Sequence, residues 1–188
     1  LVTNRRIEDT KFVFAGAGAG GIASTKLLLD HGAKHVILVD SVGIISRDRT
    51  DLTAVKSAML GTTNLDNLSG GIADAMRGAD VFIGLAAGDM ISPEMVTSMA
   101  KDSIVFAMAN PIPEIWPDLA KAAGAAVVGT GRSDFPNQVN NSLVFPGVFR
   151  GALDCHATKV TTEMKLAAAE GLAAMIVEPT AENVLPWS

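Results

Sequence analysis

Apolar residues in this chain recur in short continuous runs that alternate with stretches of helical periodicity. The first run is residues 11–15, and it is followed by glycines and then by apolar positions at helical spacing from Ile22 to Leu29. The later runs are apolar on both faces, as parallel strands are when helices cover them on each side. They cover residues 35–40, 80–85, 103–108 and 125–129. The alternation predicts five strands separated by helical segments.

Two later helices also have recognisable signals. Ser92 offers a capping hydroxyl ahead of Pro93, which predicts a helix from about Pro93 to Ala100. A second helix is predicted behind Thr161, and its apolar face is expected to dock on the domain or on a partner, with core packing as the favoured explanation. The residues of this face are Met164, Ala168, Leu172, Met175 and Ile176.

Strands that alternate with helices predict one domain over residues 1–188, without an internal repeat or a linker to a second domain. The expected fold is α/β of the Rossmann type, with an open, doubly wound and mainly parallel sheet and helices on both faces. Such sheets bind ligands at the carboxyl ends of their strands, so the functional residues are expected at that edge.

A glycine-rich segment lies between the first strand and its helix. It matches the pattern G-x-G-x-x-G with Gly16, Gly18 and Gly21, although glycines alone would also suit an ordinary turn. Gly16 permits a tight turn, Gly18 lets the backbone approach a diphosphate, and Gly21 allows the helix to pack closely on the strand. The residues assigned to the cofactor site in this segment are Gly16, Ala17, Gly18, Ala19, Gly20 and Gly21.

Asp40 strengthens the prediction of a dinucleotide site. It ends the second strand about 20 residues after the glycines, where a carboxylate accepts hydrogen bonds from the adenosine ribose. Its charge disfavours a 2′-phosphate, whereas Arg47, Arg49 and Lys56 follow closely and could neutralise one. The expected cofactor is therefore NAD or NADP, with NAD preferred.

Two polar loops are expected at the same edge of the sheet. Asn110 and Pro111 follow the fourth strand, and residues 131–141, which end in Asn140 and Asn141, follow the fifth. Amide side chains can hold a carboxylate or a carboxamide without adding charge, which suits a hydroxy acid beside a nicotinamide. The alternative is that the Asn-Pro pair forms a turn and that the paired asparagines cap a helix.

The amino-acid sequences of several segments closely resemble those of the bacterial malic enzymes. The segments occur in the same order and extend over nearly the whole chain. The most specific segment runs from Gly131 through the asparagine-rich loop to Gly147, because few other dinucleotide-binding families place such a loop before Phe-Pro-Gly. The segments that carry the resemblance are residues 14–23, 39–43, 79–84, 106–111 and 131–147.

The resemblance implies oxidation of malate at its C2 hydroxyl, decarboxylation of the resulting oxaloacetate to pyruvate and carbon dioxide, and hydride transfer to NAD or NADP. It also implies that Asn110 contacts cofactor and substrate, and that Asn140 and Asn141 contact the substrate. Ala86 is assigned to the cofactor site. The segment Leu85–Asp89 lacks the serine expected there, so a polar cofactor contact is expected to be absent.

The catalytic tyrosine and lysine of this family, and its ligands for Mg²⁺ or Mn²⁺, belong to an N-terminal domain. The chain is therefore expected to be a fragment without that domain and without the extreme C-terminus. No catalytic or metal-binding residue is assigned within it, and little activity is expected of it alone. The intact enzyme is expected to be a homo-oligomer.

The net charge and the lengths of the apolar runs argue against two kinds of partner, nucleic acid and membrane. The formal net charge of −5 offers no basic surface for nucleic acid, and no apolar run is long enough to span a bilayer. The expectation is a cytoplasmic protein. Its single cysteine, Cys155, is interpreted as a packing residue, and the chain contains no tyrosine.

The histidines do not suit a dehydrogenase relay, because His31 and His35 flank a turn at the opposite edge of the sheet and His156 follows a helix. Two functions of other classes stay open. A module that senses NAD(H) or another adenine nucleotide would need the glycines but not the asparagine loops. A methyltransferase that uses adenosylmethionine would also need a glycine-rich first turn and an acid after the second strand.

Overall fold

The computed structural model describes residues 2–186. Leu1, Trp187 and Ser188, at the two ends where truncation was expected, lie outside the described residues. The described part is built on a parallel sheet of five strands in the order β2-β1-β3-β4-β5. The strands are β1 (Lys11–Ala15), β2 (His35–Val39), β3 (Val81–Gly84), β4 (Ile104–Ala107) and β5 (Val127–Thr130). Each strand overlaps the apolar run that predicted it, and the predicted α/β fold is confirmed.

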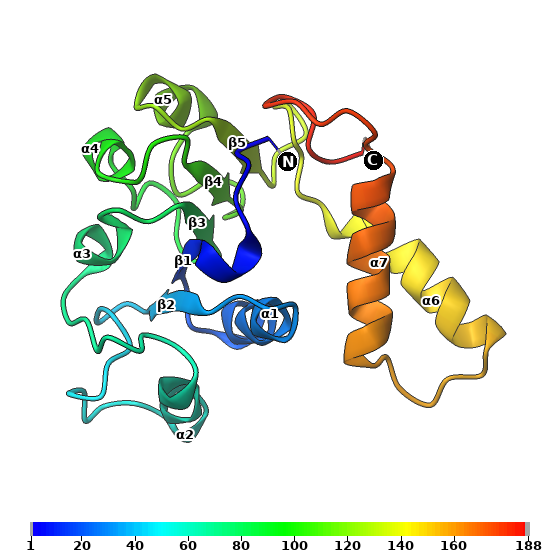
Figure 1. Cartoon of the computed structure of the whole chain (residues 1–188), viewed down its shortest axis with the longest axis horizontal. Helices are drawn as coiled ribbons and strands as arrows, with labels where there is room; N and C mark the ends of the chain where they lie inside the picture. The colour runs from blue at the N-terminus through cyan, green and yellow to red at the C-terminus, as the bar shows by residue number, and fades with distance from the viewer. Residues whose placement is uncertain (1, 187–188) are drawn as a thin grey trace.

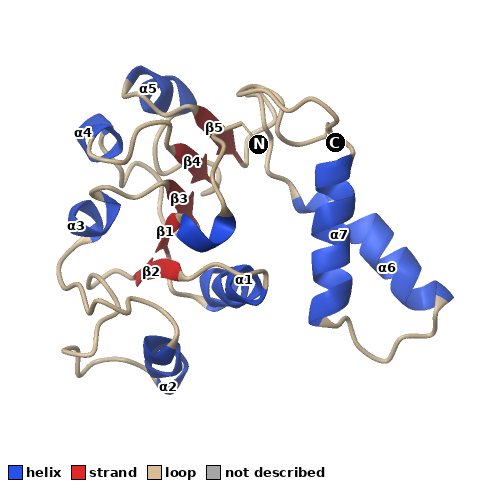
Figure 2. Ribbon diagram, viewed as in Figure 1, coloured by secondary structure: helices blue, strands red, loops and turns tan. Residues whose placement is uncertain are grey.

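Helices cover both faces of this sheet (Figures 1 and 2). The α-helices are α1 (Ala19–Asp30), α2 (Ala54–Ser57), α3 (Ile72–Met76), α4 (Pro93–Thr97), α5 (Pro117–Ala122), α6 (Phe145–Asp154) and α7 (Thr162–Ala174). Short 3₁₀ turns are η1 (Ile7–Asp9), η2 (Ala58–Gly61) and η3 (Asn141–Leu143). Helices α3, α4 and α5 lie on one face, while α1 and, farther out, α7 lie on the other. Within residues 2–186 no helix is both long and apolar enough to cross a membrane.

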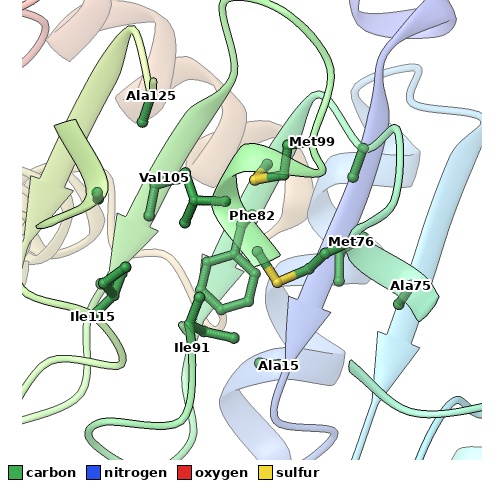
Figure 3. Packing of buried hydrophobic residues seen from close by; sticks show 14 of the residues in the cluster. Ala15, Ala75, Met76, Phe82, Ile91, Met99, Val105, Ile115 and Ala125 are labelled. Atoms are coloured by element: carbon green, nitrogen blue, oxygen red, sulfur yellow. The ribbon is translucent and has the colours of Figure 1, made fainter. Parts of the chain in front are cut away.

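Side chains of β1, β2, β3 and β4 alternate between two hydrophobic cores. Val13 of β1 belongs to the core beneath α3, α4 and α5, together with Phe82 of β3 and Val105 of β4 (Figure 3). Phe12 and Phe14 belong to the second core, which α1 covers. Both faces of β1 are therefore shielded from water, which explains why its run in the sequence is continuously apolar.

Helix α4 begins as predicted and ends earlier. The hydroxyl of Ser92 accepts a hydrogen bond from the N–H of Met95 at 3.3 Å, which confirms the predicted cap. The helix ends at Thr97, because the chain then turns back and the N–H of Ala100 donates to the carbonyl of Ala79 at 2.9 Å. This long-range bond competes with continuation of the helix.

Helices α6 and α7 form a hairpin that projects from the α/β body (Figure 1). Both lie wholly within the described residues, and neither contains a buried residue. Met164, Ala168 and Leu172 line a cavity of about 550 Å³ between the two helices. The interpretation of this face as core packing does not hold for these three residues, which face α6, whereas Ile176 lines a separate cavity with Ile104 and Phe106 of β4. Cys155, which follows α6, is exposed and is not the packing residue expected.

Candidate functional site

The glycine segment joins β1 to α1 in a turn that excludes side chains at two positions. Gly16 has a φ of +108°, and a Cβ there would collide with the backbone carbonyl of Leu85. A Cβ on Gly21 would collide with the carbonyl oxygen of Gly16. The turn and the close packing of α1 on β1 therefore both require glycine, as the sequence predicted.

The N-terminus of α1 opens onto a cavity. Gly18 is the N-cap, provides no side-chain hydrogen bond, and has open space where a Cβ would stand. Ala17, Gly18 and Ala19 line a cavity of about 440 Å³, which Lys56 also lines. The first N–H groups of a helix lack intrahelical partners, and the helix dipole gives this end a partial positive charge. The arrangement suits a phosphate group.

Asp40 lies at the end of β2, and donors already surround its carboxylate. Its Oδ1 accepts hydrogen bonds from the N–H groups of Val42 and Gly43 at 2.9 and 3.2 Å, and from Nη1 of Arg49 at 2.7 Å. Its Oδ2 accepts from Nη2 of Arg49 at 3.2 Å and from Nζ of Lys56 at 2.5 Å. The Asp40 side chain is 7% exposed. The Asp40 carboxylate is therefore already paired with Lys56, whose side chain is 25% exposed, as well as with Arg49.

These ion pairs favour the charged forms of Asp40 and Arg49. Burial raises the pKa of Asp40, but the hydrogen bonds from Arg49, Lys56 and the Val42 N–H outweigh burial and hold its pKa well below the usual range. Hydrogen bonds to Asp51 and Asp40 raise the pKa of the Arg49 guanidinium. The two acids and the two bases compensate one another, so the repulsion of a phosphate by Asp40 is weaker than the sequence suggested.

The loops that follow β3, β4 and β5 meet at the same edge of the sheet. Ala86 and Asn110 follow β3 and β4, and both are exposed. A Cβ on Gly131, which follows β5, would stand 3.1 Å from Nδ2 of Asn110. Nη1 of Arg132 donates to the carbonyl of Pro111 at 3.0 Å, and the peptide bond before Pro111 is cis. The structure thus brings Asn110 beside the start of the asparagine-rich loop.

Asn140 and Asn141 lie at the far end of that loop. The side-chain oxygen of Asn140 accepts a hydrogen bond from the N–H of Ser142 at 3.0 Å and caps η3. The alternative interpretation, that an asparagine of this pair caps a helix, therefore applies to Asn140. Asn141 is the first residue of η3 and is exposed.

Asn137, in the same loop, has a structural role. Its Nδ2 donates to the carbonyls of Val128 and Ala181 at 3.1 and 2.8 Å. Its Oδ1 accepts from the N–H of Val184 at 2.8 Å. This buried side chain fixes the loop between β5 and the C-terminal segment.

Glu114 is a buried residue near this edge that the sequence reasoning missed. It is 0% exposed, and its two carboxylate oxygens accept hydrogen bonds from the N–H groups of Ala86 and Ala109, each at 3.0 Å. The available signal was an acid placed directly before Ile115, in a segment that otherwise reads as apolar. Acids are rarely buried completely unless they are paired.

The histidines lie on the surface, as expected. His31 is the C-cap residue of α1, and His31, His35 and His156 are all exposed. Among residues 2–186, no three His, Cys, Asp or Glu side chains come close enough together to share a metal ion.

Comparison with known proteins gives these features a family context. A family model described as "Malic enzyme, NAD binding domain" matches residues 1–187. The NAD-dependent malic enzyme of Geobacillus stearothermophilus is 51% identical over 177 residues, which cover 94% of this chain and 37% of that protein. The bifunctional malic/malolactic enzyme of Bacillus subtilis is 49% identical over 188 residues, or 98% of this chain and 46% of that protein.

Solved structures agree with these relatives. The NAD-dependent malic enzyme of Thermotoga maritima superposes with a TM-score of 0.94 at 43% identity, over 98% of this chain and 49% of that one. The malic enzyme of Pyrococcus horikoshii gives a TM-score of 0.94 at 41% identity, over 99% of this chain and 45% of that one. The chain thus spans less than half the length of each of these relatives.

Proposed function

The chain belongs to the malic enzyme family, in which it corresponds to the NAD-binding domain, and we propose that it holds the nicotinamide dinucleotide of an enzyme that oxidises and decarboxylates malate to pyruvate. The observation that carries this proposal is the open N-terminus of α1. There Gly18 exposes the first turn of the helix to a cavity beside a glycine turn.

The strand order sets the direction in which the cofactor lies. We place the diphosphate against residues 16–21 and the adenosine over β2, near Asp40. Because β1 lies between β2 and β3, the nicotinamide half then extends over β3 and β4, toward Ala86 and Asn110. The bound dinucleotide accepts the hydride from C2 of malate.

The asparagine side chains are our candidates for the substrate contacts. Asn110 is exposed beside Gly131, and its amide can donate to a carboxylate. Asn140 uses its oxygen to cap η3, so we assign its amide nitrogen to the substrate, with Asn141 next to it.

The metal ion and the acid–base groups are assigned to a part of the enzyme outside this chain. Residues 2–186 contain no cluster of three candidate metal ligands, so the Mg²⁺ or Mn²⁺ of the family does not fit this chain's own residues. The sequence also contains no tyrosine. The chain alone is therefore expected to bind cofactor and to turn over little malate.

We propose a modest preference for NAD over NADP. Asp40 is the acidic group that we place beside the adenosine ribose, and Lys56 and Arg49 offset its charge. Arg47 does not join them, because its Nη1 donates to the carbonyl of Leu65 at 3.4 Å. A small difference between the two dissociation constants is expected.

The outer face of α6 carries exposed apolar side chains. Phe145, Phe149 and Leu153 of α6 are 47, 56 and 73% exposed. Neighbouring apolar side chains on one surface are typical of an interface. We propose that the intact enzyme is a homo-oligomer of the cytoplasm.

Calorimetric titration of the chain tests the proposal. NAD and NADP should bind, whereas adenosylmethionine should not. Asp40→Ala should weaken NAD binding about tenfold, because the ribose loses a charged hydrogen-bond acceptor.

Asp51→Ala is the matched control. Asp51 also pairs with Arg49, but it is 49% exposed and lies 11 residues beyond Asp40, away from the end of β2. Its removal should leave NAD affinity unchanged. An Asp40→Ala chain that binds NAD as the unmodified chain does would contradict the ribose assignment, and absence of NAD binding to the unmodified chain would contradict the proposed function.

A further inference from the structure

Glu114 links the ends of two neighbouring strands. It lies in the loop between β4 and α5, and its Oε1 accepts from the N–H of Ala86, two residues after β3. Its Oε2 accepts from the N–H of Ala109, two residues after β4. One carboxylate therefore fixes the backbone of both loops just beyond the sheet.

Backbone hydrogen bonds strengthen this connection. The N–H of Asp89 donates to the carbonyl of Pro113, and the N–H of Ile91 donates to the carbonyl of Glu114, each at 2.9 Å. The sheet also leaves room for the carboxylate, because a Cβ on Gly84 would collide with it. The Glu114 side chain thus occupies a space that is open because residue 84 has no Cβ.

The chemistry of the contact requires two acceptors at once. Within residues 2–186 the hydrogen-bond donors to the Glu114 side chain are backbone N–H groups and not cations, so burying this side chain is costly for stability. An apolar residue of similar size would fill the space but would leave both amides without an acceptor. A carboxylate is the side chain whose two oxygens can each accept from a different loop.

We propose that Glu114 is a positioning residue for the nicotinamide half of the cofactor. This inference rests on the proposed function, because strand order sends that half over β3 and β4. Ala109 directly precedes Asn110, and Ala86 is itself assigned to the cofactor site. By holding both amides, Glu114 sets where Asn110 and the loop after β3 meet the nicotinamide, and it does not touch the ligand, since it is 0% exposed.

The test compares NAD with ADP-ribose, which contains the adenosine and the diphosphate but lacks the nicotinamide. In Glu114→Gln, the amide oxygen can accept from one loop while the amide nitrogen faces the N–H of the other. The affinity for NAD should fall about tenfold, as expected when a buried amide loses its acceptor. The affinity for ADP-ribose should stay within about twofold, because residues 16–21 and Asp40 are unchanged.

Ile115→Val is the control for general loosening of the core. Ile115 is the next residue and is 2% exposed, but its side chain makes no hydrogen bond to either loop. This variant should leave the ratio of NAD affinity to ADP-ribose affinity unchanged. A Glu114→Gln chain that retains the unmodified ratio, or that loses both ligands equally, overturns the inference. Failure of the unmodified chain to bind NAD overturns the proposed function instead.

Hydrogen exchange on the unmodified chain gives a second readout, which does not depend on the folding of a variant. NAD should slow exchange at the N–H groups of Ala86 and Ala109, because the nicotinamide tightens both loops around Glu114. ADP-ribose should slow exchange at neither. Equal slowing by the two ligands contradicts the positioning role.

Discussion

Asp40 and Glu114 are two carboxylates removed from water, and the chain compensates them in different ways. Asp40 accepts from two cationic side chains and two backbone amides. Glu114 accepts from two backbone amides. Replacement of Asp40 should therefore change quantities that depend on charge, whereas replacement of Glu114 should change the geometry of the loops.

Substitutions at Gly18 should affect the stability of α1 and the affinity for NAD in different ways. Gly18→Asp should leave the free energy of unfolding unchanged or raise it by up to about 1 kcal/mol, because aspartate is a good N-cap and favours the helix dipole. The same charge should repel a diphosphate and lower NAD affinity by at least about tenfold. Urea unfolding and calorimetry measure the two quantities.

Gly18→Asn is the matched control for that charge. Asparagine has nearly the same size and caps a helix as well as aspartate does. It should therefore lose less NAD affinity than the aspartate variant. If Gly18→Asp bound NAD normally, the diphosphate would not lie at the N-terminus of α1.

The lowered pKa of Asp40 predicts how stability depends on pH. A carboxylate with a depressed pKa in the folded state stabilises the fold fully above its ordinary pKa, and this contribution is lost as the pH falls toward the folded-state value. Asp40→Asn should lower the free energy of unfolding by about 2 kcal/mol at pH 7. The difference between the two chains should shrink as the pH falls from about 5 to about 3.

Urea unfolding at several pH values checks this trend. Asp51→Asn provides the comparison, since its carboxylate pairs with the same Arg49 but is 49% exposed. Its effect should be smaller. A difference for Asp40→Asn that grows as the pH falls would show the opposite sign from the one expected.

At the scale of elements, the first turn of α1 has one packed side and one open side. A Cβ on Gly21 would collide with the carbonyl of Gly16, whereas a Cβ on Gly20 meets open space. Gly21→Ala should therefore lower the free energy of unfolding by about 1–3 kcal/mol, because α1 must move away from β1. Gly20→Ala should leave it unchanged or raise it by up to about 1 kcal/mol, because alanine favours a helix.

The two variants carry the same substitution at adjacent positions of the same helix. Thermal or urea unfolding without cofactor measures them side by side. Equal destabilisation by both would mean that the packing of α1 on β1 does not depend on Gly21. The expected difference comes from the packing of α1 against β1, because neither Gly20 nor Gly21 has a strained φ of its own.

For α7, the sequence predicted where the helix begins but not which elements pack against it. Thr161 caps α7 by accepting from the N–H of Met164 at 3.3 Å, so local signals placed this helix correctly. Its surroundings depend on which elements reach it, and the periodicity of its own residues carries no information about them.

At the scale of the molecule, the strand order brings three separate loops to one edge. The glycines follow β1, Asn110 follows β4 and Gly131 follows β5. The parallel order β2-β1-β3-β4-β5 gathers their ends on the same side of the sheet. In the proposed binding mode, a dinucleotide with its diphosphate at α1 meets loops that are far apart in the sequence.

The strands, the capped helix starts, Gly16 and Gly21 could be predicted from the sequence, because they depend on apolar runs, on local hydrogen bonds and on backbone conformation. The ion pairs of Arg49 and Lys56 with Asp40 could not be predicted and are seen in the folded chain. Tertiary structure also decided that Glu114 joins two loops and that α7 lies outside the core. These outcomes depend on contacts between distant parts of the chain, and such contacts exist only once the sheet order has brought those parts together.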